Sequence, residues 1–154
     1  MITDNSLLLE VGGSASSAIT ATRLTENVID LSAARDIGEG EDLYMVFTVT
    51  VTGTNSGTVT FQALVADNDA MSTNSFVIAE STAFVATTLT AVSSTDPNGT
   101  VIVLRLPPRI ASIGQRYLSG RFLVASTVGA VKVNCTIVKD VQDGQKFYAR
   151  GDNP

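Results

Sequence analysis

The stretch that decides the fold is Leu43-Tyr44-Met45-Val46-Phe47-Thr48-Val49-Thr50-Val51-Thr52. Its odd-numbered residues are all apolar, whereas the even-numbered residues are mostly threonine. Successive side chains of a strand point to opposite faces, so this alternation predicts a strand with one buried face. β-Branched side chains also fit a pleated sheet better than a helix. We therefore expect residues 43–52 to form a central strand around which the others pair.

The rest of the chain repeats this pattern in shorter segments that are separated by turns. Alternating or apolar runs predict strands at 19–24, 28–31, 58–66, 76–79, 84–92, 101–106, 117–126 and 131–137, with a short extension at 145–150. The glycines of the link 53–57 favour a hairpin between the runs on either side of it. About eight short strands, some of them joined by long connections, and the absence of a predicted helix favour an all-β jelly-roll sandwich.

Two of these segments carry a more detailed expectation. Residues 101–106 are almost continuously apolar, which predicts a strand that is covered on both faces. Gly120 interrupts the run 117–126, and a glycine inside a strand indicates a bulge or a close backbone approach.

The length of 154 residues suits one domain. Residues 1–18 end in a stretch of glycine, serine and alanine, which predicts a flexible N-terminal arm or a frayed end. Leu7 to Leu9 form a short apolar patch that could attach this arm to a surface. We expect the jelly-roll domain to span residues 19–150 and a tail to span 151–154.

The composition restricts the classes of partner. Charged residues make up only 16% of the chain and the net charge is −5. A surface of threonine, serine and small apolar groups suits a protein that is packed against others, and the alternative is a threonine-coated soluble monomer. The scattered bases form no stripe that would bind nucleic acid.

No run approaches the ~20 apolar residues of a membrane helix, and the N-terminus lacks the basic start of a secretory signal. We therefore expect a protein that is made and used in a cytoplasm, or that is assembled there into a particle that leaves the cell.

The residues that most enzymes use for proton transfer or metal binding are scarce. The chain has no histidine, so a Ser-His or Cys-His pair is impossible, and Cys135, its one cysteine, lies in an alternating run that predicts burial. Asp67 and Asp69 are a weak case for a metal site, and an Asx-rich turn is favoured. A glycosidase mechanism with paired carboxylates would require acids that are distant in the sequence to converge in space, and their spacing gives no sign of this. The acids concerned are Asp67, Asp69, Glu80 and Asp96. We expect no catalysis, no metal and no cofactor.

Residues 28–44, Val-Ile-Asp-Leu-Ser-Ala-Ala-Arg-Asp-Ile-Gly-Glu-Gly-Glu-Asp-Leu-Tyr, resemble a segment of the tailed-bacteriophage capsid cement proteins. In that family an Ile-Asp-Leu strand, an Ala-Arg-Asp-Ile-Gly turn and a Gly-Glu-x-Leu-Tyr entry into a long strand recur. The segments 101–107 and 116–118 are similar to its later Leu-Pro and Arg-Tyr-Leu elements, and 132–140 to its closing strand. The resemblance covers residues 28–140, and the N-terminal arm matches less well.

The resemblance implies a jelly-roll protein that decorates and braces the outside of a phage head. It implies a virion location on the outer capsid surface, binding to the major capsid protein and self-association as a homodimer or homotrimer. The candidate contact elements are residues 1–18, the loop 67–75 and the loop 107–116. The individual capsid or subunit contact candidates are Leu7, Leu8, Leu9, Asp67, Asp69, Arg109, Ile110, Ile113 and Arg116.

Two other functions stay open at this point. The first is a carbohydrate- or receptor-binding jelly-roll module of a phage tail or fibre. Sugar sites usually stack aromatic rings on the ligand, yet the chain has no tryptophan and its aromatic content is 6%. The second is a pilin-like adhesin subunit, against which the missing signal peptide and the single cysteine argue.

Overall fold

The computed structural model describes residues 7–12, 18–32, 42–92, 98–107 and 114–139. Strands dominate this part of the chain, with one short 3-10 helix at Ala86–Thr88. The strands are β1 (Leu8–Glu10), β2 (Arg23–Leu24), β3 (Ile29–Asp30), β4 (Leu43–Val51), β5 (Thr58–Ala66), β6 (Phe76–Glu80), β7 (Phe84–Val85), β8 (Val101–Leu106), β9 (Tyr117–Ala125) and β10 (Lys132–Val138). The positions of the long strands agree with the sequence prediction to within one or two residues.

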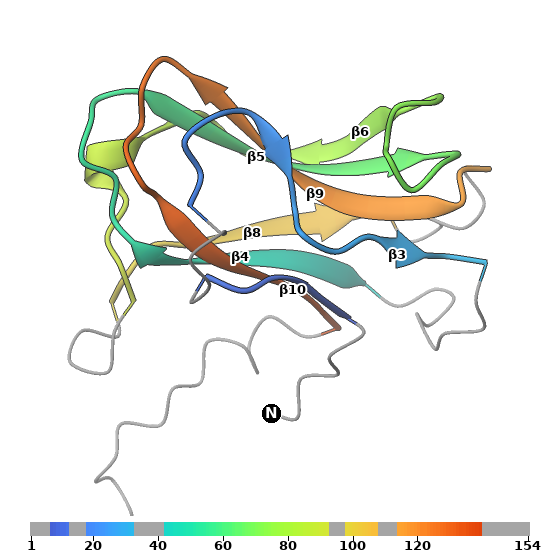
Figure 1. Ribbon diagram of the computed structural model, residues 1–154. Coiled ribbons are helices and arrows are strands. Elements are labelled where there is room, and N and C mark those ends of the chain that lie inside the picture. Colours follow the sequence, from blue (N-terminus) through green and yellow to red (C-terminus); the bar gives the residue numbers. More distant parts are fainter. Residues whose placement is uncertain (1–6, 13–17, 33–41, 93–97, 108–113, 140–154) are drawn as a thin grey trace, which may run out of the picture.

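The strands form two antiparallel sheets that lie face to face as two layers (Figure 1). One sheet has the order β1-β10-β4-β8. The other has the order β2-β9-β5-β6, with β3 added to β9 and β7 added to β5. The predicted all-β sandwich is therefore confirmed. The first strand pairs with the last, and β4 pairs with β8 and β10, an interleaved order that is compatible with the predicted jelly roll.

β4 is central in its sheet, as predicted, but the expected hairpin between β4 and β5 is wrong. The link 53–57 carries the chain from one sheet to the other, because β5 pairs with β9, β6 and β7. The glycines of this link serve close packing instead of a hairpin turn. A Cβ added at Gly53 would lie 2.6 Å from the Val128 carbonyl oxygen, and the Gly57 N–H donates to Thr127 at 3.0 Å.

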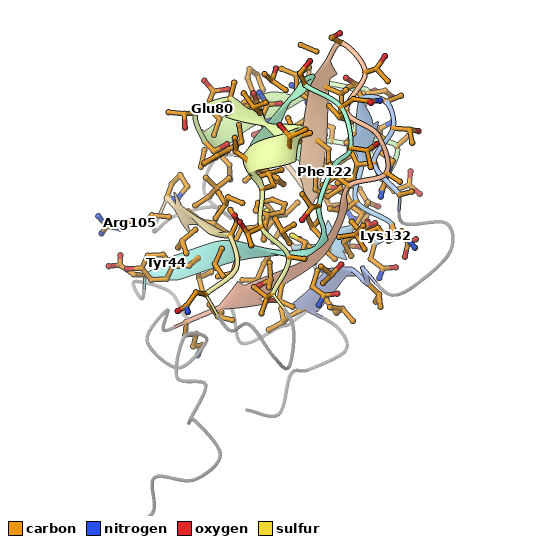
Figure 2. The ribbon with its side chains drawn as sticks, turned by 90° about the vertical axis from the view of Figure 1, so that its left-hand side faces the viewer. Tyr44, Glu80, Arg105, Phe122 and Lys132 are labelled. Carbon is orange, nitrogen blue, oxygen red and sulfur yellow. The ribbon has the colours of Figure 1, made fainter. Side chains whose placement is uncertain are left out.

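The core lies between the sheets, where three phenylalanine rings from different strands meet. The ring centroids of Phe47 and Phe61 are 5.1 Å apart, and Phe122 lies 5.9 Å from each. Figure 2 shows Phe122 between the two layers. Tilted and edge-to-face rings of this kind add stability beyond the area that they bury. Gly120 belongs to this contact region, because the Thr25 N–H donates to its carbonyl at 2.9 Å and an added Cβ would lie 2.7 Å from Thr25 Cγ2. The predicted close backbone approach is therefore confirmed.

Three other segments differ from the sequence prediction. β8 is an edge strand that alternates between buried and partly exposed residues, so it is covered on one face only. The predicted strand 84–92 is reduced to the short β7, after which the chain turns into the 3-10 helix. The predicted N-terminal arm contains β1, which pairs with β10 and places Leu9 and Glu10 in the interior. Residues 145–150 and 151–154 lie outside the described residues.

Candidate functional site

Segments that are far apart in the sequence meet at one end of the sandwich, which we call the loop end and define as residues 30–32, 66–75 and 114–117. The Arg116 N–H donates to the Ala66 carbonyl at 3.1 Å, and the Leu31 N–H donates to the Arg116 carbonyl at 2.7 Å. Figure 1 shows the β5–β6 loop, β3 and the start of β9 together at this end. The structure thus brings the predicted contact loop 67–75 beside the last residues of the predicted contact loop 107–116.

The loop 67–75 has a defined conformation, because the Asn68 side chain organises it. The Asn68 Oδ1 atom accepts hydrogen bonds from the backbone N–H groups of Ser72 (2.9 Å) and Thr73 (3.0 Å), and Nδ2 donates to the Ser72 hydroxyl at 2.9 Å. The Asp67 carboxylate accepts a hydrogen bond from Asn74 Nδ2 at 2.6 Å. Side chains that replace backbone partners in this way hold a turn without help from a sheet. The prediction of an Asx-rich turn is confirmed, and Asp69 is exposed on it.

A buried methionine fixes this loop to the outer face of the second sheet. Met71 has a positive φ of 54°, and its side chain packs against Leu64 and Ala66 of β5. A left-handed conformation is unfavourable for a side chain of this kind, and burial of the apolar side chain offsets its cost. Leu24, Val28 and Tyr117 complete this small outer cluster. Met71 was not predicted as part of the site, and the available signal was a single large apolar side chain within a mostly polar loop.

An ion pair closes the other side of the loop end. The Arg116 guanidinium donates to both carboxylate oxygens of Asp30, at 3.0 and 2.6 Å, and lies 5.0 Å from the centroid of the Tyr117 ring. The Arg116 hydrogen bond, with additional hydrogen bonds from Ser32, holds the pKa of Asp30 well below its usual range. The same contact raises the pKa of Arg116 above its ordinary value. Both groups are therefore charged across the neutral and mildly acidic range.

This ion pair leads to a pH-dependent prediction. Because the folded-state pKa of Asp30 is depressed, its contribution to stability is present above the pKa of an unfolded aspartate, about 3.9, and is lost as the pH falls below that value. We expect Asp30→Asn to lower the melting temperature at pH 7 and to narrow its difference from the wild type between about pH 4 and pH 2. Thermal melts across pH 2–7 would measure this. Asp69→Asn is the control, since Asp69 forms no ion pair among the described residues. A constant difference at all pH values would contradict the assignment.

The remaining predicted contact residues are placed as follows. Leu9 is fully buried between the sheets and therefore has no surface to offer a partner in this fold. Leu7 and Leu8 are partly buried, and Leu7 packs against the core. Arg109, Ile110 and Ile113 lie outside the described residues. Of the predicted set, Asp67, Asp69 and Arg116 are exposed, and all three belong to the loop end.

Metal-binding groups and reactive thiols are the next feature of the described residues. No group of three or more His, Cys, Asp or Glu residues in it could hold a metal ion. Cys135 is buried, as predicted, and burial raises the pKa of its thiol well above the ordinary value, with Glu10 adding to the effect. A thiol in this state is a poor nucleophile. In the same residues, no helix combines the length and apolar character that a membrane span requires.

A second surface feature lies next to the loop end and was not expected from the sequence. β6 forms an edge of the second sheet, and its first two side chains, Phe76 and Val77, are 53% and 42% exposed. They begin the strand at the residue that follows the loop 67–75. The alternation of apolar and polar residues does not tell whether residues 76–80 form an edge strand or an inner strand, because that depends on which strands pair.

A comparison with protein families places these observations in context. A family model described as Bbp16 matches residues 13–137, which is most of the chain. The match begins after β1 and ends within β10. The family name is of the kind given to bacteriophage proteins and supports a phage origin. No curated protein matches the sequence.

Proposed function

The chain belongs to the Bbp16 family, and on this premise we propose that it is a structural protein of a phage virion that decorates the outside of the head. In this proposal it binds the major capsid protein as a cement protein and stabilises the contacts between neighbouring capsomers. It is made in the host cytoplasm, self-associates as a homodimer or homotrimer, and acts without catalysis or cofactor.

The observation that carries the proposal is the rigid loop end in a member of this family. The loop 67–75 is fixed by the Asn68 hydrogen bonds on one side and by the buried Met71 on the other. A preorganised surface loses little conformational freedom when it binds, so more of the contact energy appears as affinity. Asp67, Asp69 and Arg116 are the charged groups that this surface would present to the capsid.

A decoration protein of this kind stabilises a shell by adding contact area. Internal pressure from packaged DNA can open the head only after the contacts that bridge capsomers are lost. Many copies act on one lattice, and multivalent attachment lets a modest affinity at each site give a strong total effect. The low charge of the chain, with 16% charged residues, suits a surface that stays packed against neighbours.

The proposal is tested with phage heads that lack this protein. Purified protein is mixed with the heads, and co-sedimentation and the temperature of head rupture are measured. We expect the protein to sediment with the heads and to raise the rupture temperature, with the effect saturating as the sites fill. Absence of co-sedimentation would contradict the proposal.

The alternative function, a sugar-binding module, predicts that the purified protein binds glycans. The central aromatic rings of the described structure, Phe47, Phe61 and Phe122, pack against one another at tilted and edge-to-face angles inside the core and are not available to a sugar. We expect no signal on a glycan array, and specific glycan binding without binding to heads would favour the alternative.

A further inference from the structure

The sheet edges of the described structure differ in how well they are protected. β1 has three residues, and Asn27 donates to the carbonyls of Leu8 at 3.0 Å and Leu9 at 2.9 Å. β2 and β3 have two residues each. The start of β8 lies beside a neighbouring segment, because the Thr100 N–H donates to the Thr90 carbonyl at 2.8 Å. Short strands and covering segments are the usual means by which proteins stop an edge from pairing with another chain.

β6 is longer than the edge strands β1, β2 and β3, and none of its residues is a base, whereas β8 carries Arg105. It has five residues, Phe76–Glu80, none of which is lysine or proline, the residues that most often block an edge. Phe76 and Val77 are 53% and 42% exposed. The pairing with β5 shifts register between Ala63 and Leu64, which is a mild irregularity, and the rigid loop 67–75 holds the start of the strand in place. The result is an ordered strand that pairs with β5 on one side and with no other strand of the described structure.

The charged side chains of β6 and of the loop 67–75 before it are all negative. Residues 36–104 contain no lysine or arginine. Asp67 and Asp69 lie at the Phe76 end of the strand, and Glu80 is its last residue, where it accepts a hydrogen bond from Gln62 at 2.9 Å. Figure 2 shows Glu80 and Arg105 on the same side of the sandwich, with Lys132 on the other. Arg105 belongs to the other sheet, and its charge is matched by Asp42 at 2.7 Å.

This charge distribution argues against a second copy of the chain as the partner of β6. In an antiparallel pair of two β6 strands, the Asp67 and Asp69 end of one copy would face Glu80 of the other. In a parallel pair, the two acidic loops would face each other. Like charges opposite one another destabilise strand pairing. The acids therefore favour an added strand that carries bases, and they also keep free copies of the protein apart.

We propose that β6 accepts an extended segment of the capsid protein as an added strand, in the mode of β-augmentation. The segment presents apolar side chains to Phe76 and Val77 and carries a lysine or arginine near each end, opposite Asp67, Asp69 and Glu80. Backbone hydrogen bonds along the edge supply affinity, and the side-chain positions supply selectivity. The inference rests on the proposed function, of which it specifies the contact.

Val77→Lys tests the inference, with Leu123→Lys as the matched control. Leu123 is 41% exposed on β9, away from the edge, so the two variants add the same charge at sites of equal exposure. Both are compared with the wild type for binding to heads that lack the protein, after thermal melts have shown that each is folded. We expect Val77→Lys to weaken binding by about tenfold or more and Leu123→Lys to bind within about twofold of the wild type.

Hydrogen exchange on the wild type gives an independent readout. Amides of residues 76–80 that point away from β5 should exchange more slowly on heads than in solution, because an added strand would hydrogen-bond them. Normal binding by Val77→Lys, or no change in exchange at β6 while the wild type binds, would overturn the inference and leave the proposed function standing. Failure of the wild type to bind heads would overturn both.

Discussion

Replacement of Phe47 by alanine is expected to lower the free energy of unfolding by about 3–5 kcal/mol. Phe47 is fully buried in β4, and its ring contacts those of Phe61 and Phe122 from the opposite sheet. The loss has two parts, the transfer free energy of the missing ring atoms and the cavity that the rigid sheets cannot close. Urea denaturation of the wild type and variant, followed by circular dichroism, would measure the change.

Phe76→Ala is the control for this prediction. It removes the same ring from a residue that is 53% exposed, and we expect a loss below about 1 kcal/mol. Similar losses for the two variants would show that the contact between the two sheets at Phe47 does not dominate the stability of the sandwich.

Arg23→Met is expected to cost about 3 kcal/mol, because it leaves a buried carboxylate without its partner. Glu10 of β1 is fully buried, and its two oxygens accept hydrogen bonds from the Arg23 guanidinium at 2.6 and 3.2 Å. The backbone N–H of Glu26 donates to the same carboxylate at 2.8 Å. The guanidinium also lies 5.0 Å from the centroid of the Phe122 ring, and this cation–π contact would be lost as well.

The double variant Glu10→Met/Arg23→Met separates the ion pair from packing. A buried pair that is replaced as a whole by apolar residues often costs little, so we expect the double variant to be more stable than Arg23→Met alone. Guanidinium denaturation of the wild type, both single variants and the double variant completes the thermodynamic cycle. If the double variant loses the sum of the single effects, the two side chains are not coupled and the interpretation is wrong.

The burial of Phe47 could be predicted from the sequence, whereas the burial of Glu10 could not. Phe47 lies in the clearest alternating stretch of the chain, and its burial follows from the two-residue period of a strand. Glu10 lies in a segment whose glycine, serine and alanine content predicts an arm, and nothing local indicates that a glutamate there is buried. Its burial depends on Arg23, whose strand belongs to the other sheet.

The candidate site shows the same division. The loop 67–75 is recognisable as an Asx-rich turn, since Asn and Asp side chains form hydrogen bonds with backbone groups a few residues away. The packing of Met71 on β5 and the contact of Arg116 with Asp30 join residues that are separated by up to 86 positions. Local patterns carry no information about such partners. The exposed edge at β6 likewise depends on the strand order, which the alternation leaves undetermined.

The sequence by itself determined where the long strands lie, which face of the alternating strand β4 is buried, and that histidine-based chemistry is absent. These properties follow from the alternation of side chains along a strand and from composition, and both are local. Only the tertiary structure decided that β4 and β5 belong to different sheets, that β1 completes the first sheet, and that β6 lies at a sheet edge. The physical reason is that strand pairing joins distant residues through backbone groups that are nearly the same at every position.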